Sequence, residues 1–437
     1  MKLEMNELKA SEPILTCTSG PDQGKRLVIR QKDVVMGRHV ACDLVSDDPD
    51  MADRHLKVCL RGERPWFQTI ADAPVFVDGH RVLEGPIDAK QQLRIGRSFW
   101  KLSDTRAGET FSGWLDHLSG HISSAAGVEK VQNFIVSETF SDIFKTRMDE
   151  DIEEYFNVGT RTTTPSLLEI DTSWPKPWVF FKLFSLAVVV YLGFVFALTE
   201  FQNPILVPGL IAIGSFLIPF SILVLFFELN VPRNVPLYQV LRLLLLGGIL
   251  SLILSLFLFR AIQLDSWLGA MSAGIVEEIG KASALLLVIN KLKYRWILNG
   301  LLFGAAVGTG FAAFESAGYA FIYGLSGGQD LMLEVITRRG LLSILGGHVL
   351  WTALVGAALW KVREDRRFSL EMVTDPRCLR VLALAMVLHM VWNSPLDLPF
   401  YLKYVALGFV AWVVILGFIQ DGLTQIQRVR DQTKQAG

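Results

Sequence analysis

The sequence is short of charged residues and of cysteine, and its net charge is close to zero. Only 19% of its 437 residues are charged, and 42 Lys and Arg nearly balance 43 Asp and Glu. Such a chain has no general positive field for holding nucleic acid. The four cysteines form no C-x-x-C pair, which is typical of a reducing compartment. We therefore expect neither a duplex-binding protein nor a disulfide scaffold.

Several catalytic motifs are also missing. The chain has no H-E-x-x-H and no G-x-S-x-G, so it lacks the signatures of soluble zinc proteases and of serine hydrolases. The segment Gly20 to Lys25 imitates a phosphate loop but is one residue too short, and Arg26 follows where Ser or Thr should bind magnesium. Met1 to Pro13 is polar where a signal peptide would be apolar, so we expect a cytoplasmic N-terminus.

What the sequence has in excess is apolar residues, at 51% of the chain. The composition changes near Trp174 to Trp178, where paired Trp and Pro are typical of a lipid headgroup boundary. Beyond it, apolar runs recur that are long enough to cross about 30 Å of hydrocarbon. We predict about eight transmembrane helices, at roughly 179–199, 205–227, 238–259, 266–289, 297–323, 341–360, 378–393 and 400–419.

The basic residues between these helices predict the orientation in the membrane. With the N-terminus inside, the cytoplasmic connections hold the larger set: Arg233, Arg242, Lys291, Lys293, Arg295, Lys361, Arg363, Arg366, Arg367, Arg377 and Arg380. The outer connections hold only Arg260, Arg338, Arg339 and Lys403. This asymmetry favours a multi-pass protein of the inner (plasma) membrane with both termini in the cytoplasm.

The first hundred residues predict a different fold class, a small all-β sandwich. Short alternating runs are separated by turn residues, at Arg26 to Arg30, Val34 to Gly37, His55 to Leu60, Trp66 to Ile70, Val75 to Val77, Gln92 to Ile95 and Phe99 to Leu102. We therefore divide the chain into a sandwich at 14–103, a partly helical connector at 104–173, an all-α membrane domain at 174–420 and a cytosolic tail at 421–437.

Ionisable residues stand inside the predicted transmembrane helices, where a charge costs at least about 2.5–3.5 kcal/mol. The fourth helix carries Glu277, Glu278 and Lys281, and the next three carry Glu315, His348 and His389 in turn. Each group alone would fit a structural ion pair or hydrogen bond. Three carboxylates and both imidazoles of the membrane half, spread over four helices, indicate one shared site.

The helical spacing of these residues divides their roles. Glu277 shares a face with Lys281 at i,i+4, whereas Glu278 meets Lys281 only across i,i+3. One glutamate is therefore expected to do chemistry while the other is held. Tyr319 lies on the face of Glu315, and Asn393 on the face of His389. Such groups can activate a water molecule, stabilise an oxyanion or hold zinc.

A row of glycines also predicts where helices pack closely. Gly300, Gly304 and Gly308 form a small-xxx-small face on the fifth helix, which permits close contact with a neighbouring helix and would draw Glu315 toward the shared site.

These segments resemble the ordered motifs of the PrsW family, bacterial intramembrane proteases related to CAAX prenyl endopeptidases. The matching pieces are E-E-x-x-K at 277–281, F-x-x-x-E at 311–315 with Tyr319, His348 with Thr352 and Gly356, and H-x-x-x-N at 389–393. The resemblance implies a catalytic set of Glu277, Glu278, Glu315, His348, His389 and Asn393, with Lys281 and Tyr319 in support. Glu315, His348 and His389 would hold zinc if a metal is used. Ser316 departs from the Asn that is common in the family.

The front domain resembles a forkhead-associated (FHA) sandwich, through Gly37-Arg38, Arg54-His55, Val77-Asp78-Gly79 and Ile95-Gly96. Such modules bind phosphothreonine through Arg, Ser and Asn on adjacent loops. Arg38 is retained, but Ala52 stands at the serine position, Asp53 follows it, and Asp78 replaces the asparagine. Two carboxylates repel a phosphate, so we expect this face to bind a cytosolic protein partner without phosphothreonine.

The sequence as a whole predicts an intramembrane endopeptidase with a recruiting module. The resemblance implies a membrane protein as substrate, such as a single-pass anti-sigma factor. It leaves open whether zinc or a glutamate activates the water. Two alternatives are a non-catalytic receptor or scaffold that retains the fold, and a transporter that uses the carboxylates as a proton relay.

Overall fold

The computed structural model describes residues 13–436 apart from 63, 71–72, 89–90, 104, 133, 290, 341 and 343–344. The polar segment at 1–12 and the first residue of the predicted helix 341–360 therefore lie outside the described residues. The chain divides into two compact units, 1–118 and 119–437, and the division falls within α1 (Thr105–Ala126). Our domain limits at 103, 173 and 420 stay proposals.

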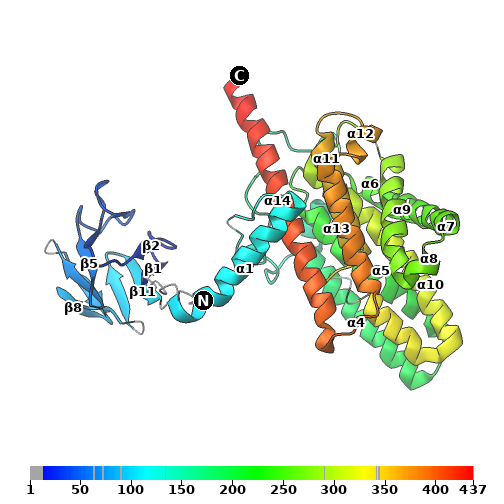
Figure 1. Ribbon diagram of the computed structural model, residues 1–437, viewed down its shortest axis with the longest axis horizontal. Helices are drawn as coiled ribbons and strands as arrows, with labels where there is room; N and C mark the ends of the chain where they lie inside the picture. Colours follow the sequence, from blue (N-terminus) through cyan, green and yellow to red (C-terminus); the bar gives the residue numbers. More distant parts are fainter. Residues whose placement is uncertain are drawn as a thin grey trace, which may run out of the picture. The chain divides into compact units, whose positions relative to one another are not determined.

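The first unit contains two β-sheets, as the alternating runs predict (Figure 1). The six-stranded sheet has the order β2-β1-β11-β10-β7-β8, and the five-stranded sheet has the order β4-β3-β5-β6-β9. The strands are β1 (Ile14–Ser19), β2 (Arg26–Val28), β3 (Val34–Gly37), β4 (Leu44–Val45), β5 (Leu56–Arg61), β6 (Arg64–Thr69), β7 (Val75–Val77), β8 (His80–Val82), β9 (Glu84–Pro86), β10 (Gln92–Ile95) and β11 (Ser98–Ser103). Side chains such as Leu15, Phe67 and Trp100 are fully buried in its core.

Two sequence features fix the loops of this unit. Asp78 and Gly79 both have positive φ, 48° and 88°, and form the tight turn between β7 and β8 that Asp-Gly favours. At Gly37 a β-carbon would lie 2.2 Å from the carbonyl oxygen of Asp53, so only glycine lets these two loops meet.

The second unit is helical. Its elements, with those of the connector, are α2 (Val136–Thr139), α3 (Asp149–Phe156), α4 (Val179–Phe201), η1 (Pro204–Leu206), α5 (Val207–Leu229), α6 (Leu237–Arg242), the π-helix η2 (Leu243–Gly247), α7 (Gly248–Ile262), α8 (Asp265–Leu268), η3 (Gly269–Ser272), α9 (Ala273–Val288), α10 (Ile297–Arg339), α11 (His348–Arg363), α12 (Leu370–Val373), α13 (Pro376–Asn393), η5 (Pro399–Tyr401) and α14 (Leu402–Ala436).

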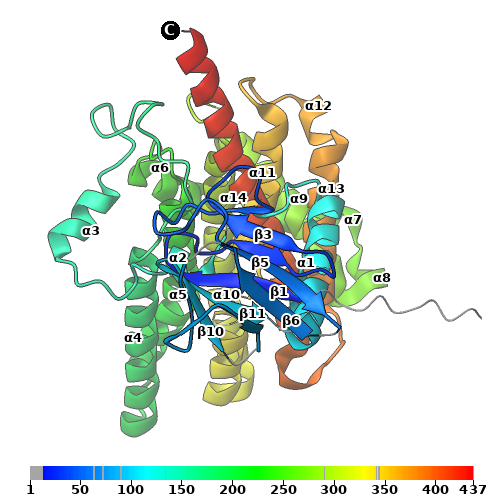
Figure 2. The ribbon, with the colours of Figure 1, turned by 90° about the vertical axis from the view of Figure 1, so that its left-hand side faces the viewer.

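Among the described residues, five helical segments are long and apolar enough to span a membrane: 179–201, 204–229, 237–262, 297–339 and 399–435. A helix lies within each of the eight predicted ranges, but the count of eight transmembrane helices stays a prediction, because α9, α11 and α13 have only 16 to 18 residues and carry the polar groups of the site. Figure 2 shows α4 beside α5, and α4 is largely uncovered by protein, as expected of a helix that faces lipid.

The glycine face packs α10 directly against α11, as predicted. β-Carbons at Gly300, Gly304 and Gly308 would lie 2.4, 2.1 and 2.3 Å from carbonyl oxygens of α11. The oxygen facing Gly308 belongs to His348, the first residue of α11. Because this face of α10 has no side chains, the backbone of His348 can pack directly on it, and this contact sets the position from which the His348 imidazole extends.

The helix α10 differs from its predicted range, which ended at 323. It runs to Arg339 and is interrupted at Gly328, whose backbone is non-helical (φ 80°). Glycine adopts this conformation without the steric penalty of other residues. The residues that follow, 329–339, form a second arm of α10 that returns to the first, because Arg339 contacts Glu315.

Candidate active site

Polar side chains from α9, α10, α11 and α13 meet in one cluster inside the second unit. Glu278 and Lys281 are completely buried, and Glu277 and His389 are nearly so. His348 and Glu315 are partly buried beside them. The structure thus brings together the ionisable residues that the sequence singled out on separate helices.

The two glutamates of α9 have different surroundings. Glu278 accepts a hydrogen bond from the Lys281 ammonium (2.5 Å) and another from His389 Nδ1 (2.9 Å), both at Oε1. Because a carboxylate only accepts, Nδ1 of His389 carries the proton and its Nε2 is left with a lone pair. Glu278 is the glutamate that is held, through the i,i+3 contact with Lys281.

A second carboxylate orients the other imidazole. The Lys281 ammonium lies 2.9 Å from His348 Nδ1, and Glu315 Oε2 lies 2.9 Å from His348 Nε2. An ammonium only donates, so Nδ1 of His348 is the acceptor and Nε2 donates to Glu315. A carboxylate that fixes the tautomer of a histidine is the usual support of a metal-binding or basic imidazole.

Glu277 faces the remaining nitrogen of each ring. Its Oε2 lies 3.9 Å from His348 Nδ1 and 3.8 Å from His389 Nε2. This buried oxygen has no hydrogen-bond partner among the described residues. One ligand atom from each of Glu277, His348 and His389 lies within 4.8 Å of the others. These three atoms therefore surround one point, a donor set that fits a metal ion or a polarised water molecule, although His348 Nδ1 also accepts from Lys281.

A cavity of about 750 Å³ opens onto this cluster, and Glu277, Glu315 and His389 lie in its wall. Tyr319 and Asn393 also line it. The Asn393 amide donates to the carbonyl oxygen of Ala270, which lies outside the cluster (3.3 Å). Among the described residues it donates to no member of the cluster. The cavity gives the water-binding point a route for a substrate chain.

Arg339 is the residue of this site that the sequence reasoning missed. Its Nη2 donates to Glu315 Oε2, its Nε donates to Ser316 Oγ (3.3 Å), and its guanidinium lies 4.5 Å from the centre of the Tyr319 ring. In the sequence Arg339 reads as a loop cation, and no spacing links it to Glu315. The link exists only because the second arm of α10 returns at Gly328.

Aromatic rings enclose the cluster on its buried side. Trp351 stacks on His389, with ring centres 4.4 Å apart, and Phe311 lies 4.6 Å beneath the Lys281 ammonium. These rings limit the movement of the imidazole and the ammonium. Phe311 is the first residue of the F-x-x-x-E motif, so that motif supplies both a wall and a carboxylate.

Comparison with known proteins agrees with this arrangement. Residues 235–419 match the model of the PrsW family intramembrane metalloproteases. Residues 235–419 form a PrsW-family domain. The match contains every residue of the cluster, from Glu277 to Asn393. No curated protein matches the chain. The similarity to intramembrane metalloproteases thus covers residues 235–419, which include the helices that carry the cluster.

The first unit has matches of its own. Residues 17–106 match the cytoplasmic domain of an inner membrane component of the type III secretion system. Similar solved structures include the FHA domain of CT664 from Chlamydia trachomatis (18% identity, 22% of this chain and 98% of that one, TM-score 0.20). Another is the cytoplasmic domain of the sorting platform protein PscD from P. aeruginosa (21%, 22% and 84%, 0.21). The matched residues 17–106, called the FHA-like domain below, precede the PrsW-family domain in the chain.

The predicted partner-binding face of the FHA-like domain lies on its loops. The Arg38 guanidinium is 3.4 Å from the Asp53 carboxylate, and both side chains are exposed. The backbone of Ala52 accepts a hydrogen bond from the Arg38 N–H (3.1 Å). Asp78 uses its carboxylate to accept from the Gln92 N–H (3.0 Å). Arg38 therefore already has a carboxylate as its counter-ion.

Asp22 is a buried acid of this domain with several hydrogen-bond donors around it. Its carboxylate accepts hydrogen bonds from Ser46 Oγ and the Asp47 N–H, and it pairs with Lys25 at 2.9 Å. Burial alone would raise the pKa of Asp22, but these donors outweigh burial and hold the pKa below its usual value. The segment 20–25, which imitates a phosphate loop, is a turn between β1 and β2 anchored by this acid.

Proposed function

We propose that the protein is an endopeptidase that hydrolyses a membrane protein substrate at the point bounded by Glu277, His348 and His389. One observation carries the proposal: the unpartnered Oε2 of Glu277 faces one nitrogen of each imidazole, and a carboxylate holds the other nitrogen of each ring. Such a point binds and polarises a water molecule next to a cavity open to substrate.

The residues present also fit a zinc ion. Two imidazole nitrogens and one carboxylate oxygen are the His₂Glu donor set of hydrolytic zinc sites. The cluster holds three carboxyl groups, of Glu277, Glu278 and Glu315, and two cationic side chains, of Lys281 and Arg339, so a bound cation would be balanced by the third carboxylate. A bound zinc ion would make its water a stronger acid and so a nucleophile at neutral pH.

We favour Glu277 over Glu315 as the carboxylate of that set. Glu315 is already engaged by Arg339 and His348 Nε2, whereas Glu277 Oε2 has no hydrogen-bond partner among the described residues and faces His348 Nδ1 and His389 Nε2. Glu315 and Glu278 then act as the supports that set the two tautomers. Lys281 would have to release His348 Nδ1 for a metal to bind there.

The reaction requires a proton path as well as a nucleophile. Glu277 accepts a proton from the water molecule while the oxygen of the water adds to the scissile carbonyl carbon. The same proton then passes from Glu277 to the leaving amine nitrogen as the C–N bond breaks, which restores the Glu277 carboxylate. Asn393, in the cavity wall, is our candidate donor to the carbonyl oxygen that becomes negative.

The test compares membrane proteomes of cells that make the wild type or Glu277→Gln. We expect substrate fragments only with the wild type. The matched control is Glu200→Gln, the same chemical change at an exposed position at the end of α4. Fragments that persist in Glu277→Gln and His348→Ala would reject the enzyme and favour a receptor or scaffold. Proton-coupled uptake without any fragments would favour a transporter.

Metal analysis separates the two forms of the proposal. Zinc bound by the purified wild type should be lost in Glu277→Gln and retained in Glu315→Gln. Full activity after chelation would instead favour Glu277 as a base without metal. Loss of zinc in Glu315→Gln but not in Glu277→Gln would show that Glu315 is the carboxylate ligand.

We propose that the FHA-like domain recruits a protein partner in the cytoplasm of a cell whose inner membrane holds the PrsW-family domain. The Arg38–Asp53 pair supports binding that does not depend on phosphothreonine. Titration of the full chain with phosphothreonine peptides tests this, and tight binding that Arg38→Ala abolishes would overturn it. Labelling of single cysteines from either side of the membrane tests the orientation.

A further inference from the structure

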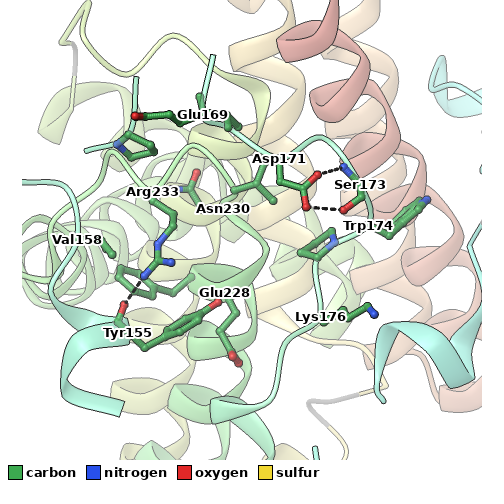
Figure 3. A pocket seen from close by; sticks show the side chains of 15 residues that line it. Tyr155, Val158, Glu169, Asp171, Ser173, Trp174, Lys176, Glu228, Asn230 and Arg233 are labelled. Atoms are coloured by element: carbon green, nitrogen blue, oxygen red, sulfur yellow. Dashed lines mark hydrogen bonds between the residues drawn. The ribbon is translucent and has the colours of Figure 1, made fainter. Parts of the chain in front are cut away.

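A second cavity, of about 660 Å³, lies outside the PrsW-family site (Figure 3). Its walls come from the connector before α4, from the residues that lead into α4 and from the end of α5 with the loop after it. The helix α4 begins at Val179 and α5 ends at Leu229. Because both helices are membrane spans, the cavity lies at the level where lipid headgroups meet water.

Arg233 projects into this cavity from a rigid loop. Its backbone has φ 44°, a left-handed conformation that is uncommon for a residue other than glycine. The loop is held by Asn299, whose amide donates to Asn230 Oδ1 (2.9 Å) and to Asn234 Oδ1 (2.7 Å). Pro236 bounds it and packs on Gly159 of the connector, where a β-carbon would lie 2.3 Å from the Pro236 nitrogen. Strained backbone on a fixed loop often marks a functional side chain.

The guanidinium of Arg233 is largely unused by the protein. It donates one long hydrogen bond to the carbonyl oxygen of Tyr155 (3.4 Å) and lies 4.9 Å from the centre of that ring. Arginine has five N–H donors, and Arg233 forms no ion pair with a described residue. Most of its donors therefore face the cavity. Lys176, at the rim, has no ion pair or hydrogen bond in the described part of the chain.

Three carboxylates line the same cavity but are engaged elsewhere. Glu228 accepts from the backbone N–H groups of residues 178–180 at 2.8 to 2.9 Å and so holds the start of α4. Asp171 accepts from Ser173 N and Oγ, and Glu169 accepts from the Ser166 N–H. These hydrogen bonds lower the pKa of Asp171 and of Glu169, so both acids stay negative at neutral pH.

The cavity therefore presents charges of both signs on different walls. Figure 3 shows Arg233 and Asp171 on opposite sides of the space. A simple anion would meet the carboxylates, and a simple cation would meet Arg233. A ligand with a phosphate at one end and an ammonium at the other would satisfy both walls.

We propose that this cavity binds a phosphate diester that carries a primary amine, the chemistry of an ethanolamine headgroup. Arg233 donates two hydrogen bonds to the phosphate oxygens, a geometry that suits a guanidinium. The ammonium donates to Asp171 on the opposite wall. The position at the membrane surface makes a phospholipid the natural source, and the site does not depend on the proteolytic function.

Native mass spectrometry of the full chain in detergent tests the proposal. The protein is titrated with phosphatidylethanolamine, phosphatidylglycerol and phosphatidylcholine of identical acyl chains. We expect retention of the ethanolamine lipid to be about tenfold higher, since each lost charged hydrogen bond costs about that factor. Arg233→Gln should remove this preference, and Asp171→Asn should reduce it. The control is Arg161→Gln, an exposed cation of the same connector that does not line the cavity.

Soluble glycerophosphoethanolamine distinguishes the two sources of the ligand. If glycerophosphoethanolamine displaces phosphatidylethanolamine at a similar concentration, the ligand is recognised by its headgroup and can be water-soluble. If it does not displace the lipid, the lipid is held by its acyl chains as well. Equal retention of all three lipids by the wild type would overturn the proposal, and so would full preference in Arg233→Gln. Unchanged elution and thermal stability of each variant show that it has folded.

Discussion

The close approach of α10 and α11 at Gly308 predicts that a single methyl group will disable the site. A β-carbon there would lie 2.3 Å from the carbonyl oxygen of His348, whereas ordinary contact needs at least about 3.4 Å. In Gly308→Ala the backbone of His348 must therefore move by about 1 Å. That movement disturbs the contacts of its ring with Glu315 and Lys281. A misplacement of this size costs about a hundredfold in rate.

The assay is cleavage of a co-purified substrate, with thermal unfolding measured in the same detergent. Overpacking should cost about 1–3 kcal/mol of stability, so the variant should still fold while its activity is nearly lost. The control is Gly318→Ala on the same helix, where nothing lies within 4 Å of the added carbon. Equal activity of the two variants would refute the reasoning, because it would mean that α11 tolerates the shift or that His348 is not needed.

Three further predictions concern charge. Lys281→Met leaves the Glu278 carboxylate buried without its cation and should destabilise the domain by about 3–5 kcal/mol, and Lys281→Met with Glu278→Gln should recover part of this in thermal unfolding. Arg339→Gln should lower kcat because Glu315 loses its cation, whereas Arg339→Lys should keep part of the activity; equal rates for all three proteins would show that Arg339 has no such role. Asp22 has a lowered pKa in the FHA-like domain, so its stabilising effect is complete above the unfolded pKa and is lost as the pH falls toward the folded one. Asp22→Asn should flatten the acid limb of a pH titration of unfolding, and an unchanged limb would contradict this.

Much of the fold could be predicted because each half of the chain follows one simple pattern. Strand alternation located β2, β3, β5, β6, β7, β10 and β11, and long apolar runs located the helices of the membrane region. The strand β1 was missed although it has six residues, and the strands β4, β8 and β9 were missed because two or three residues show no clear period. The second arm of α10 was missed because Gly328 and the polar residues near it read as a loop.

The sequence by itself determined that ionisable residues of four helices share a site. Hydrocarbon cannot solvate Glu277, Lys281 or His389, so these side chains must turn inward and find one another. It also determined the contact of α10 with α11, because a glycine face can only meet backbone.

Only the tertiary structure decided which glutamate faces both imidazoles and which is held by Lys281. Glu277 and Glu278 are adjacent on α9, so the sequence does not tell which of them plays which role. The answer depends on the rotation of α9 against α11 and α13. The same is true of Arg339, and of the cavity at Arg233, whose walls are brought together by chain reversals that no local pattern specifies.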